Sequence, residues 1–295
     1  MLLQAHHLAT VTMPAKHPFE WCDAMNEYFL KPPLRLWWLT ALLIAINCGL
    51  FGWQVLSGVS ATNPSVAELI GWGADFAPLT LTHENWRLLS SMFLHIGAVH
   101  LLLNMWALYL FGVYAEFYYG RVWYGALYLL TGIAGNLASN YVNLHNALAF
   151  SNTAILQAGS MNNSLAPSVS AGASGAIMGI CGALLVAALW PRKDLEPKYL
   201  LNKNALIMLT LLNLGLGVFV SGINSIAHLG GFMAGLIIAL GYRLSLNISG
   251  FSRYSLQLVL IAASIALLMY IDNWLIEHAK QLLHFWSIYL IQLKH

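Results

Sequence analysis

A serine flanked by small residues is the first candidate for chemistry in this sequence. Ser174 lies in the stretch Gly172-Ala173-Ser174-Gly175, at the start of a long apolar run. A serine at the amino terminus of a helix lies beside unpaired backbone N–H groups and the positive end of the helix dipole, which can stabilise an oxyanion. The glycines let a substrate backbone approach closely. The alternative is an ordinary helix cap, because serine is a common N-cap residue.

His228 is the matching candidate for a general base. It lies early in another apolar run, and Gly231 and Gly235 follow it. Gly175 and Gly179 show the same four-residue spacing after the serine. Small residues at this spacing let two helix backbones come close, as a hydrogen bond between a serine and a histidine on two helices requires. The alternative is a packing motif with an incidental histidine.

A third group of residues offers donors for a developing negative charge. His100 and Asn104 are four residues apart, so they share one face of a helix, and His95 precedes them. An asparagine amide and a histidine ring can each donate a hydrogen bond, so two stacked donors could stabilise an oxyanion. The alternative is that they join neighbouring helices, as Asn and His often do in membranes.

The composition indicates what kind of elements must carry these residues. Of the 295 residues, 59% are hydrophobic and 8% are charged, and the mean hydropathy is +0.68. Soluble domains carry about 25% charged residues, so this chain requires a lipid bilayer around it. The 11 Trp and 13 Tyr residues fit two membrane–water interfaces. A net charge of +2 gives no reason to expect a nucleic-acid partner.

The apolar segments predict an all-α polytopic bundle that forms one domain. A span needs about 20 apolar residues, and the predicted spans are 36–56, 95–115, 122–141, 174–190, 204–221, 226–244 and 256–276. Residues 57–94 are predicted to lie partly in the outer interface, and 142–173 to form a flexible loop. The tail 277–295 is predicted to be an amphipathic interfacial helix.

The positive charges orient this bundle, because cytoplasmic loops carry an excess of Lys and Arg. With the amino terminus in the cytoplasm, ten of these residues lie inside and three outside, the three being Arg87, Lys280 and Lys294. Ser174, His228 and His100 then all lie between a few ångströms and about 10 Å below the outer surface. The first 30 residues lack a long apolar segment, so no cleavable signal peptide is expected.

Other classes of membrane protein fit the sequence less well. A zinc intramembrane protease requires His-Glu-x-x-His, and His83-Glu84-Asn85-Trp86-Arg87 fails at its last position. An aspartyl intramembrane protease requires two aspartates in mid-membrane, whereas only Asp272 lies in a predicted span. No inverted repeat or pair of broken helices indicates a transporter. The spacing of the cysteines predicts neither a disulfide framework nor a zinc site, and no metal or cofactor is expected.

These residues together resemble the rhomboid family of intramembrane serine proteases. The resemblance covers about residues 36–246 and rests on a set of motifs in the family's order: Trp86-Arg87, His95, His100, Asn104, Glu116, Gly172–Gly175 and Ala227-His228 with Gly231 and Gly235. It implies a six-span catalytic core at 36–246 with a serine–histidine dyad. A cytoplasmic extension, 1–35, would precede the core, and a seventh span with the amphipathic tail, 247–295, would follow it.

The resemblance also implies roles for the remaining residues. Asn104, His100 and the backbone N–H of Ser174 would form the oxyanion hole. Three residues would support the first external loop: Arg87, Glu116 and His95. Met178 stands where the family often has an aromatic residue beneath the histidine.

The implied activity is cleavage of single-span membrane proteins near the outer face of the plasma membrane. The alternative is a catalytically inactive relative that binds and escorts membrane proteins. Such relatives typically lack the serine or the histidine, and this chain has both.

Overall fold

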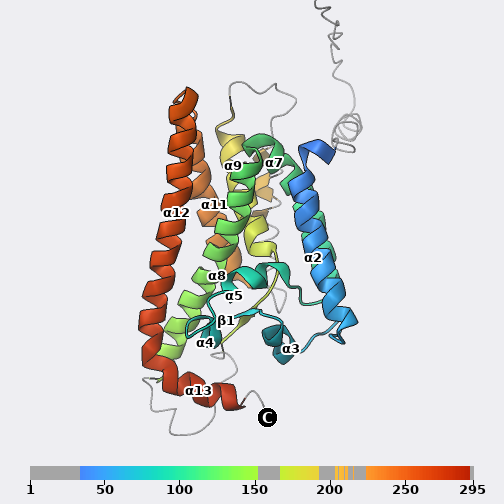
Figure 1. Ribbon diagram of the computed structural model, residues 1–295, viewed down its shortest axis with the longest axis vertical. Coiled ribbons are helices and arrows are strands. Elements are labelled where there is room, and N and C mark those ends of the chain that lie inside the picture. Colours follow the sequence, from blue (N-terminus) through green and yellow to red (C-terminus); the bar gives the residue numbers. More distant parts are fainter. Residues whose placement is uncertain are drawn as a thin grey trace, which may run out of the picture.

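The computed structural model describes residues 34–151, 167–192 and 224–292, together with 203–204, 206–208, 210–211 and 215. Its long helices run side by side in one bundle, with α2 on one flank and α12 on the other (Figure 1). The described residues also contain one short antiparallel strand pair, formed by β1 (Asp75–Phe76) and β2 (Val169–Ser170). The predicted all-α class is therefore confirmed. The predicted extension 1–35 falls almost wholly outside the described residues, and the predicted span 204–221 falls mostly outside them.

Among the described residues, four helical stretches are long and apolar enough to cross a membrane. They are α2 (Trp38–Leu56), the stretch Ala98–Tyr119, α11 (Ser225–Ser245), and a stretch from Gly250 to Ser287 that begins with α12 (Gly250–Ala279). The helix α9 (Ser174–Leu189) is apolar but shorter. The predicted span 122–141 lies within α8 (Arg121–Ser151), which has 31 residues. The chain is thus an integral, multi-pass membrane protein.

The second spanning stretch is made of three consecutive helical pieces. They are α6 (Ala98–Ala107), the π-helical turn η3 (Leu108–Gly112) and α7 (Val113–Tyr119). This stretch corresponds to the predicted span 95–115 but begins at Ala98, because Gly97 adopts a φ of +134° that ends the preceding loop. Such a φ is accessible mainly to glycine. His95 consequently lies in the loop just before the span.

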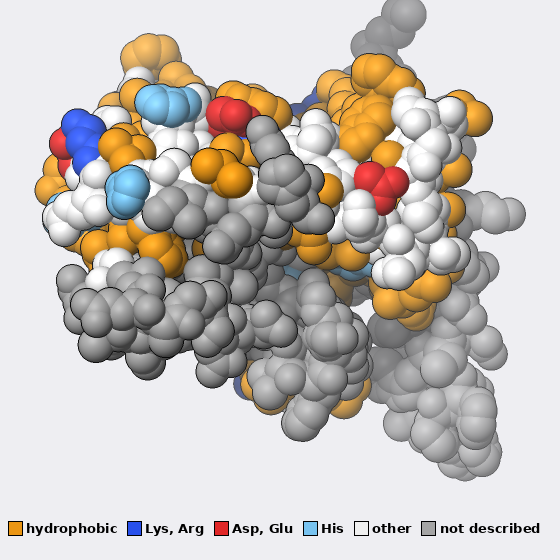
Figure 2. Space-filling view, turned by 90° about the horizontal axis from the view of Figure 1, so that it is seen from below, with side chains coloured by type: hydrophobic (Ala, Val, Ile, Leu, Met, Phe, Trp, Pro, Cys, Tyr) orange, Lys and Arg blue, Asp and Glu red, His pale blue; other side chains and the backbone are white. Residues whose placement is uncertain are grey.

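The first loop, residues 57–97, is a compact structure at one end of the bundle. It contains α3 (Val66–Gly71), β1, α4 (Ala77–Thr80), α5 (Arg87–Ser90) and the 3-10 turn η2 (Ser91–Phe93). A capping box between Ser65 and Glu68 begins α3. Seen from this end of the bundle, the described surface shows few charged side chains among hydrophobic and uncharged polar ones (Figure 2).

The prediction of a flexible loop at 142–173 was wrong for both of its described parts. Residues 142–151 continue α8, because Leu144 and Ala147 are buried in a hydrophobic cluster with residues of the carboxy-terminal helices. At the other end of this segment, β2 pairs with β1 of the first loop, with Asp75 opposite Ser170. Residues 152–166 lie outside the described part of the chain.

The carboxy-terminal segment crosses the end of the bundle instead of continuing straight. After α12, the 3-10 turn η7 (Lys280–Leu282) leads into α13 (Leu283–Gln292), which turns away from the axis of α12 (Figure 1). A helix in the tail was predicted, and its placement at the membrane interface remains a prediction.

Candidate active site

Glycines bring the backbones of α9 and α11 into direct contact. A Cβ atom built on Gly231 would collide with the carbonyl oxygen of Gly175, and one on Gly235 with that of Gly179. These four glycines are called the glycine seam below. Only glycine permits this approach, because any larger side chain would force the two helices apart. The seam fixes the distance between the helices that carry Ser174 and His228.

Ser174 is the first residue of α9, and its hydroxyl does not occupy the N-cap position. Ala173 is the N-cap residue, and it makes no side-chain capping bond. Gly172 has a φ of +140°, a conformation that glycine adopts without strain. The backbone therefore turns sharply just before the half-buried Ser174. An ordinary serine cap does not explain this geometry.

Ser174 and His228 line the same cavity, together with residues from the first loop, β2, α6 and α8. The other lining residues are Met92, His100, Gly132, Asn136, Val169, Ser170, Ala171, Gly172, Gly175, Asn224 and Ala227. His228 is buried near the start of α11. The side chain of Asn224 caps that helix by accepting the Ala227 N–H at 3.0 Å, and it donates to Ser139 Oγ at 2.7 Å. The beginning of α11 is thereby fixed to α8.

His100 and Asn104 lie against the backbone that leads into Ser174. A Cβ atom on Gly172 would lie 2.8 Å from His100 Cε1, 3.2 Å from His100 Nε2 and 3.6 Å from Asn104 Nδ2. Nδ1 of His100 accepts the Ile96 N–H at 3.4 Å, so the hydrogen of the neutral ring belongs on Nε2. Asn104 Nδ2 is buried without a hydrogen-bond partner among the described residues. Two donors thus face the turn before the serine.

His95 packs beside His100, and its location differs from the predicted one. The two rings meet edge to face, with centroids 5.3 Å apart, and His95 is fully buried in the first loop. Its contact with His100 places it behind one of the candidate oxyanion donors.

Asn136 of α8 is a site residue that the sequence reasoning did not single out. Its Nδ2 donates to the Leu88 carbonyl at 2.9 Å and to Ser91 Oγ at 2.8 Å, and its Oδ1 accepts from Ser170 Oγ at 3.2 Å. The Ser91 carbonyl also accepts the Gly172 N–H at 2.9 Å. The first loop is therefore bonded directly to the segment before Ser174. The only available signal was a polar residue inside an apolar run.

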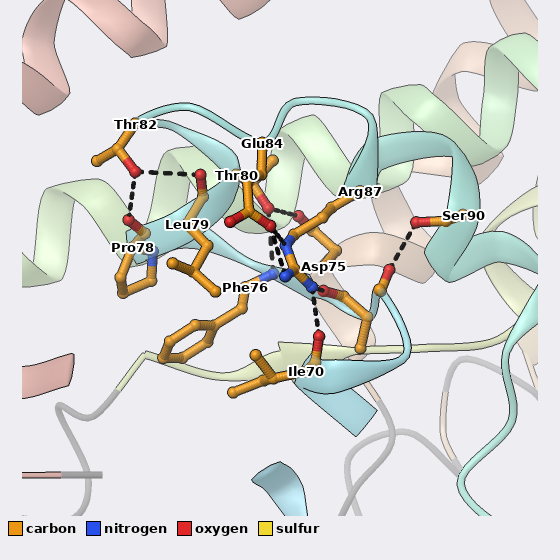
Figure 3. Close-up of polar contacts among 12 residues, drawn as sticks. Ile70, Asp75, Phe76, Pro78, Leu79, Thr80, Thr82, Glu84, Arg87 and Ser90 are labelled. Carbon is orange, nitrogen blue, oxygen red and sulfur yellow. Dashed lines mark hydrogen bonds and ion pairs between the residues drawn. The ribbon is translucent and has the colours of Figure 1, made fainter. Parts of the chain in front are cut away.

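Arg87 joins several parts of the first loop to one another (Figure 3). Its guanidinium donates to the carbonyl oxygens of Ile70 and Ala74, at 2.6 Å and 3.1 Å, and pairs with Glu84 at 2.6 Å. Ser90 adds a hydrogen bond to the Gly73 carbonyl at 2.6 Å. Buried carbonyl groups in a turn require such donors, so the arginine stabilises the bend between α3 and β1.

Glu116 does not support the first loop, and that expectation is corrected. Its carboxylate accepts the N–H groups of Leu39 and Thr40 at 3.2 Å and 2.8 Å, and the Thr40 hydroxyl at 2.9 Å. These donors belong to the first turn of α2, at the opposite end of the bundle from the first loop (Figure 1). A carboxylate at a helix amino terminus satisfies unpaired N–H groups, so Glu116 anchors α2.

The sequence of this chain matches a known family. The family model described as Rhomboid domain matches residues 82–245, a range that contains Ser174, His228, His100 and Asn104. This chain belongs to the rhomboid family. It is 33% identical to Rhomboid protease GluP of Bacillus subtilis over 231 residues. These residues are 78% of this chain and 40% of GluP.

Two further rhomboid relatives cover different shares of their own length. Rhomboid protease AarA of Providencia stuartii is 32% identical over 214 residues, which are 69% of this chain and 72% of AarA. RHOMBOID-like protein 4 of Arabidopsis thaliana is 31% identical over 166 residues, which are 56% of this chain and 36% of that protein. The chain spans less than half of the length of GluP and of RHOMBOID-like protein 4, and most of the length of AarA.

Proposed function

We propose that this chain is an intramembrane serine endopeptidase that acts through a dyad of Ser174 and His228. The observation that carries the proposal is the glycine seam, which holds the two side chains on one cavity. His100 and Asn104 supply donors at the turn before the serine. Nδ1 of His228 has no hydrogen-bond partner among the described residues, which supports a dyad instead of a triad.

The proposed reaction is acyl transfer in two steps. His228 accepts the proton of the Ser174 hydroxyl, and Oγ attacks the carbonyl carbon of the substrate peptide bond. The oxyanion accepts hydrogen bonds from the Ser174 N–H, His100 Nε2 and Asn104 Nδ2. His228 then protonates the leaving amine. In the second step His228 deprotonates a water molecule, which attacks the acyl-enzyme, and His228 returns that proton to Ser174 Oγ as the carboxylic acid leaves. The chain's own residues suffice for every proton transfer.

The proposed orientation places the amino terminus in the cytoplasm and the cavity toward the outer face of the plasma membrane. The ten-to-three distribution of Lys and Arg supports it. In this arrangement the first loop, α13 and the start of α9 face outward, and the Glu116 anchor faces the cytoplasm. Cysteine accessibility in intact cells tests this, and external labelling of a cysteine at position 198 would contradict it.

The proposed substrates are single-span membrane proteins whose outer end unwinds easily. A helical peptide bond is shielded, because its carbonyl oxygen accepts the N–H four residues on. Glycine or proline near the outer end of a span weakens the helix. The narrow approach beside Gly172 favours a small residue before the cut bond. Equal cleavage of a poly-Leu span and a matched span containing Gly-Ala would refute this.

Labelling with a fluorophosphonate tests the mechanism directly. The wild-type protein is expected to be labelled and to cleave a model single-span substrate, whereas Ser174→Ala and His228→Ala are expected to do neither while remaining folded. Cleavage by purified Ser174→Ala would exclude the serine mechanism. A folded wild-type protein that binds the substrate without labelling or cleavage would favour the escort alternative.

A further inference from the structure

The carboxy-terminal helices share one buried hydrophobic cluster with the first loop and α8. The first loop contributes Ala77, Leu81 and Leu88, and α8 contributes Leu137, Leu144 and Ala147. The segment that follows the match to the family contributes the remaining four residues: Leu275, Ala279, Leu282 and Trp286. These residues lie at the end of the bundle where α13 crosses under the first loop (Figure 1). This cluster is called the terminal cluster below.

Trp286 of α13 is the largest fully buried side chain among the described residues. Its indole Nε1 has no hydrogen-bond partner in the described part of the chain, so the ring acts through packing alone. A second contact joins the same two regions, because Asn85 of the first loop donates to Asp272 of α12 at 3.4 Å. The carboxy-terminal helices therefore contact the first loop through residues that do not line the cavity.

A short series of contacts leads from the terminal cluster to Ser174. The side chain of Leu88 lies in the cluster, and its carbonyl oxygen accepts from Asn136. Asn136 also accepts a hydrogen bond from Ser170 of β2. Ala173, the N-cap residue of α9, follows Ser170 by three positions. One turn further in the first loop, the Ser91 carbonyl accepts the Gly172 N–H. The bonds from Asn136 to Leu88 and from Ser170 to Asn136 are buried, so a shift of α5 is expected to displace the backbone before the serine.

We propose that Trp286 is a positioning residue for the candidate active site, holding residues 170–172 in place through Leu88 and Asn136. The inference rests on the proposed function, because it assigns a consequence for cleavage to a residue outside the cavity. The carboxy-terminal helices would then keep the residues before Ser174 in position, without contributing any reacting group. Small misplacements of reacting groups lower the rate sharply, whereas binding along the rest of the substrate is retained.

Three variants of the full-length protein test this inference. Trp286→Ala removes the largest side chain of the terminal cluster, and Trp286→Phe keeps an aromatic ring there without losing a hydrogen bond. Tyr270→Ala is the matched control, because Tyr270 is an aromatic residue of α12 that is 68% exposed. Trp286→Ala is expected to lower kcat by about tenfold to a hundredfold with KM close to wild type. Trp286→Phe is expected to restore most of kcat, and Tyr270→Ala to leave it unchanged.

Hydrogen–deuterium exchange separates positioning from a general loss of stability. Faster exchange in 167–173 and 85–92 is expected in Trp286→Ala, with α2 and α6 unchanged. Unchanged exchange in 167–173, or an equal increase in every helix, would overturn the inference. If Trp286→Ala does not accumulate, Trp286→Leu gives the same comparison. If the wild-type protein neither cleaves nor labels, the proposed function fails, and the exchange pattern still decides whether Trp286 orders 170–172.

Discussion

A methyl group would be tolerated very differently along the glycine seam and along α2. At Gly231 or Gly235 it would collide with a backbone carbonyl of α9, whereas at Gly49 or Gly52 it would meet no described atom within 4 Å. The seam joins α9 to α11 by direct backbone contact. By contrast, α2 is held by a few core side chains such as Leu43 and by polar contacts, including those of Glu116 and the bond from Thr40 to Tyr124 at 3.0 Å.

The helices α9 and α11 are thus held by backbone contact, whereas α2 is held by side-chain contacts. The helices that carry Ser174 and His228 cannot shift without breaking backbone packing, and packed interiors deform little. We expect α2 to be the more easily displaced helix if its polar anchor is lost, because many of its large side chains are exposed. The chemistry therefore sits on the rigid part, and any movement that admits a substrate is expected on the side of α2.

The largest effect is expected from adding a methyl group to the seam. Gly235→Ala should destabilise the folded protein by about 3 kcal/mol or more, because two helix backbones must separate. Gly52→Ala, the matched control on α2, should change the stability by less than about 1 kcal/mol. Thermal unfolding of both variants in detergent measures the difference. Equal unfolding midpoints would show that the seam is no tighter than α2.

The second effect concerns Asn104, which lies on α6 and faces the turn before the serine. Asn104→Ala is expected to lower kcat by about 10² to 10³, because it removes one donor to the oxyanion. KM should change little, since the donor acts mainly in the transition state. Steady-state kinetics with a single-span substrate measure both constants. A lower unfolding midpoint with intact kcat would instead identify Asn104 as a residue that joins helices.

A smaller effect is expected when α2 loses its anchor. Glu116→Ala should cost about 1–3 kcal/mol, because the Thr40 and Leu39 N–H groups lose a buried acceptor. Amide exchange should become faster at the start of α2, while exchange at the glycine seam stays slow. Glu277→Ala is the control, since the exposed pair with Lys280 should contribute less than about 1 kcal/mol. Equal destabilisation by the two variants would contradict the anchoring role.

The last effect is a pH dependence that arises from Asp75 in the first loop. Burial, helped by the nearby Asp272, raises the pKa of this carboxyl from 3.8 to about 6, although its bonds from Asn140 and Thr80 and the nearby Arg87 lower it. The protonated group therefore favours the folded state below pH 3.8, and this contribution is lost as the pH rises through about 6.

Asp75→Asn should remove that part of the pH dependence. As the pH rises from 4 to 7, the unfolding midpoint of the wild-type protein should fall relative to that of the variant. The reason is that the pKa of Asp75 is about two units higher in the folded state than in the unfolded state. The difference between the two proteins isolates Asp75 from other titrating groups. Parallel curves over this range would show that Asp75 titrates normally.

Local spacing was sufficient to predict the glycine seam, but not the full lining of the cavity, which also includes Asn136. The four-residue spacing of glycines after Ser174 and His228 predicts close helix contact, because residues four apart share one face. Apolar length predicted the helices, and the structure confirms the all-α class. What could be predicted in this way depends on residues near one another in the chain.

The remaining features depend on contacts between distant segments. Nothing near Asn136 in the sequence shows that it faces Leu88 and Ser170, and nothing near Glu116 shows that it faces α2. The extension of α8 to Ser151 was missed for the same reason, since its polar composition suits a loop unless Leu144 is buried by the carboxy-terminal helices. Packing between segments overrides local propensity at such positions.

The π-helical turn at Leu108–Gly112 divides one membrane span into two rotational frames. Each residue of an α-helix advances the helix by about 100°, so a widened turn resets the angular phase between α6 and α7. His100 and Asn104 point from the first frame toward Gly172, and Glu116 points from the second toward Thr40. One continuous helical stretch can thus contact the segment before α9 from its first part and α2 from its second part. Deleting one residue from this turn would rotate one set of contacts away while leaving the other set aligned.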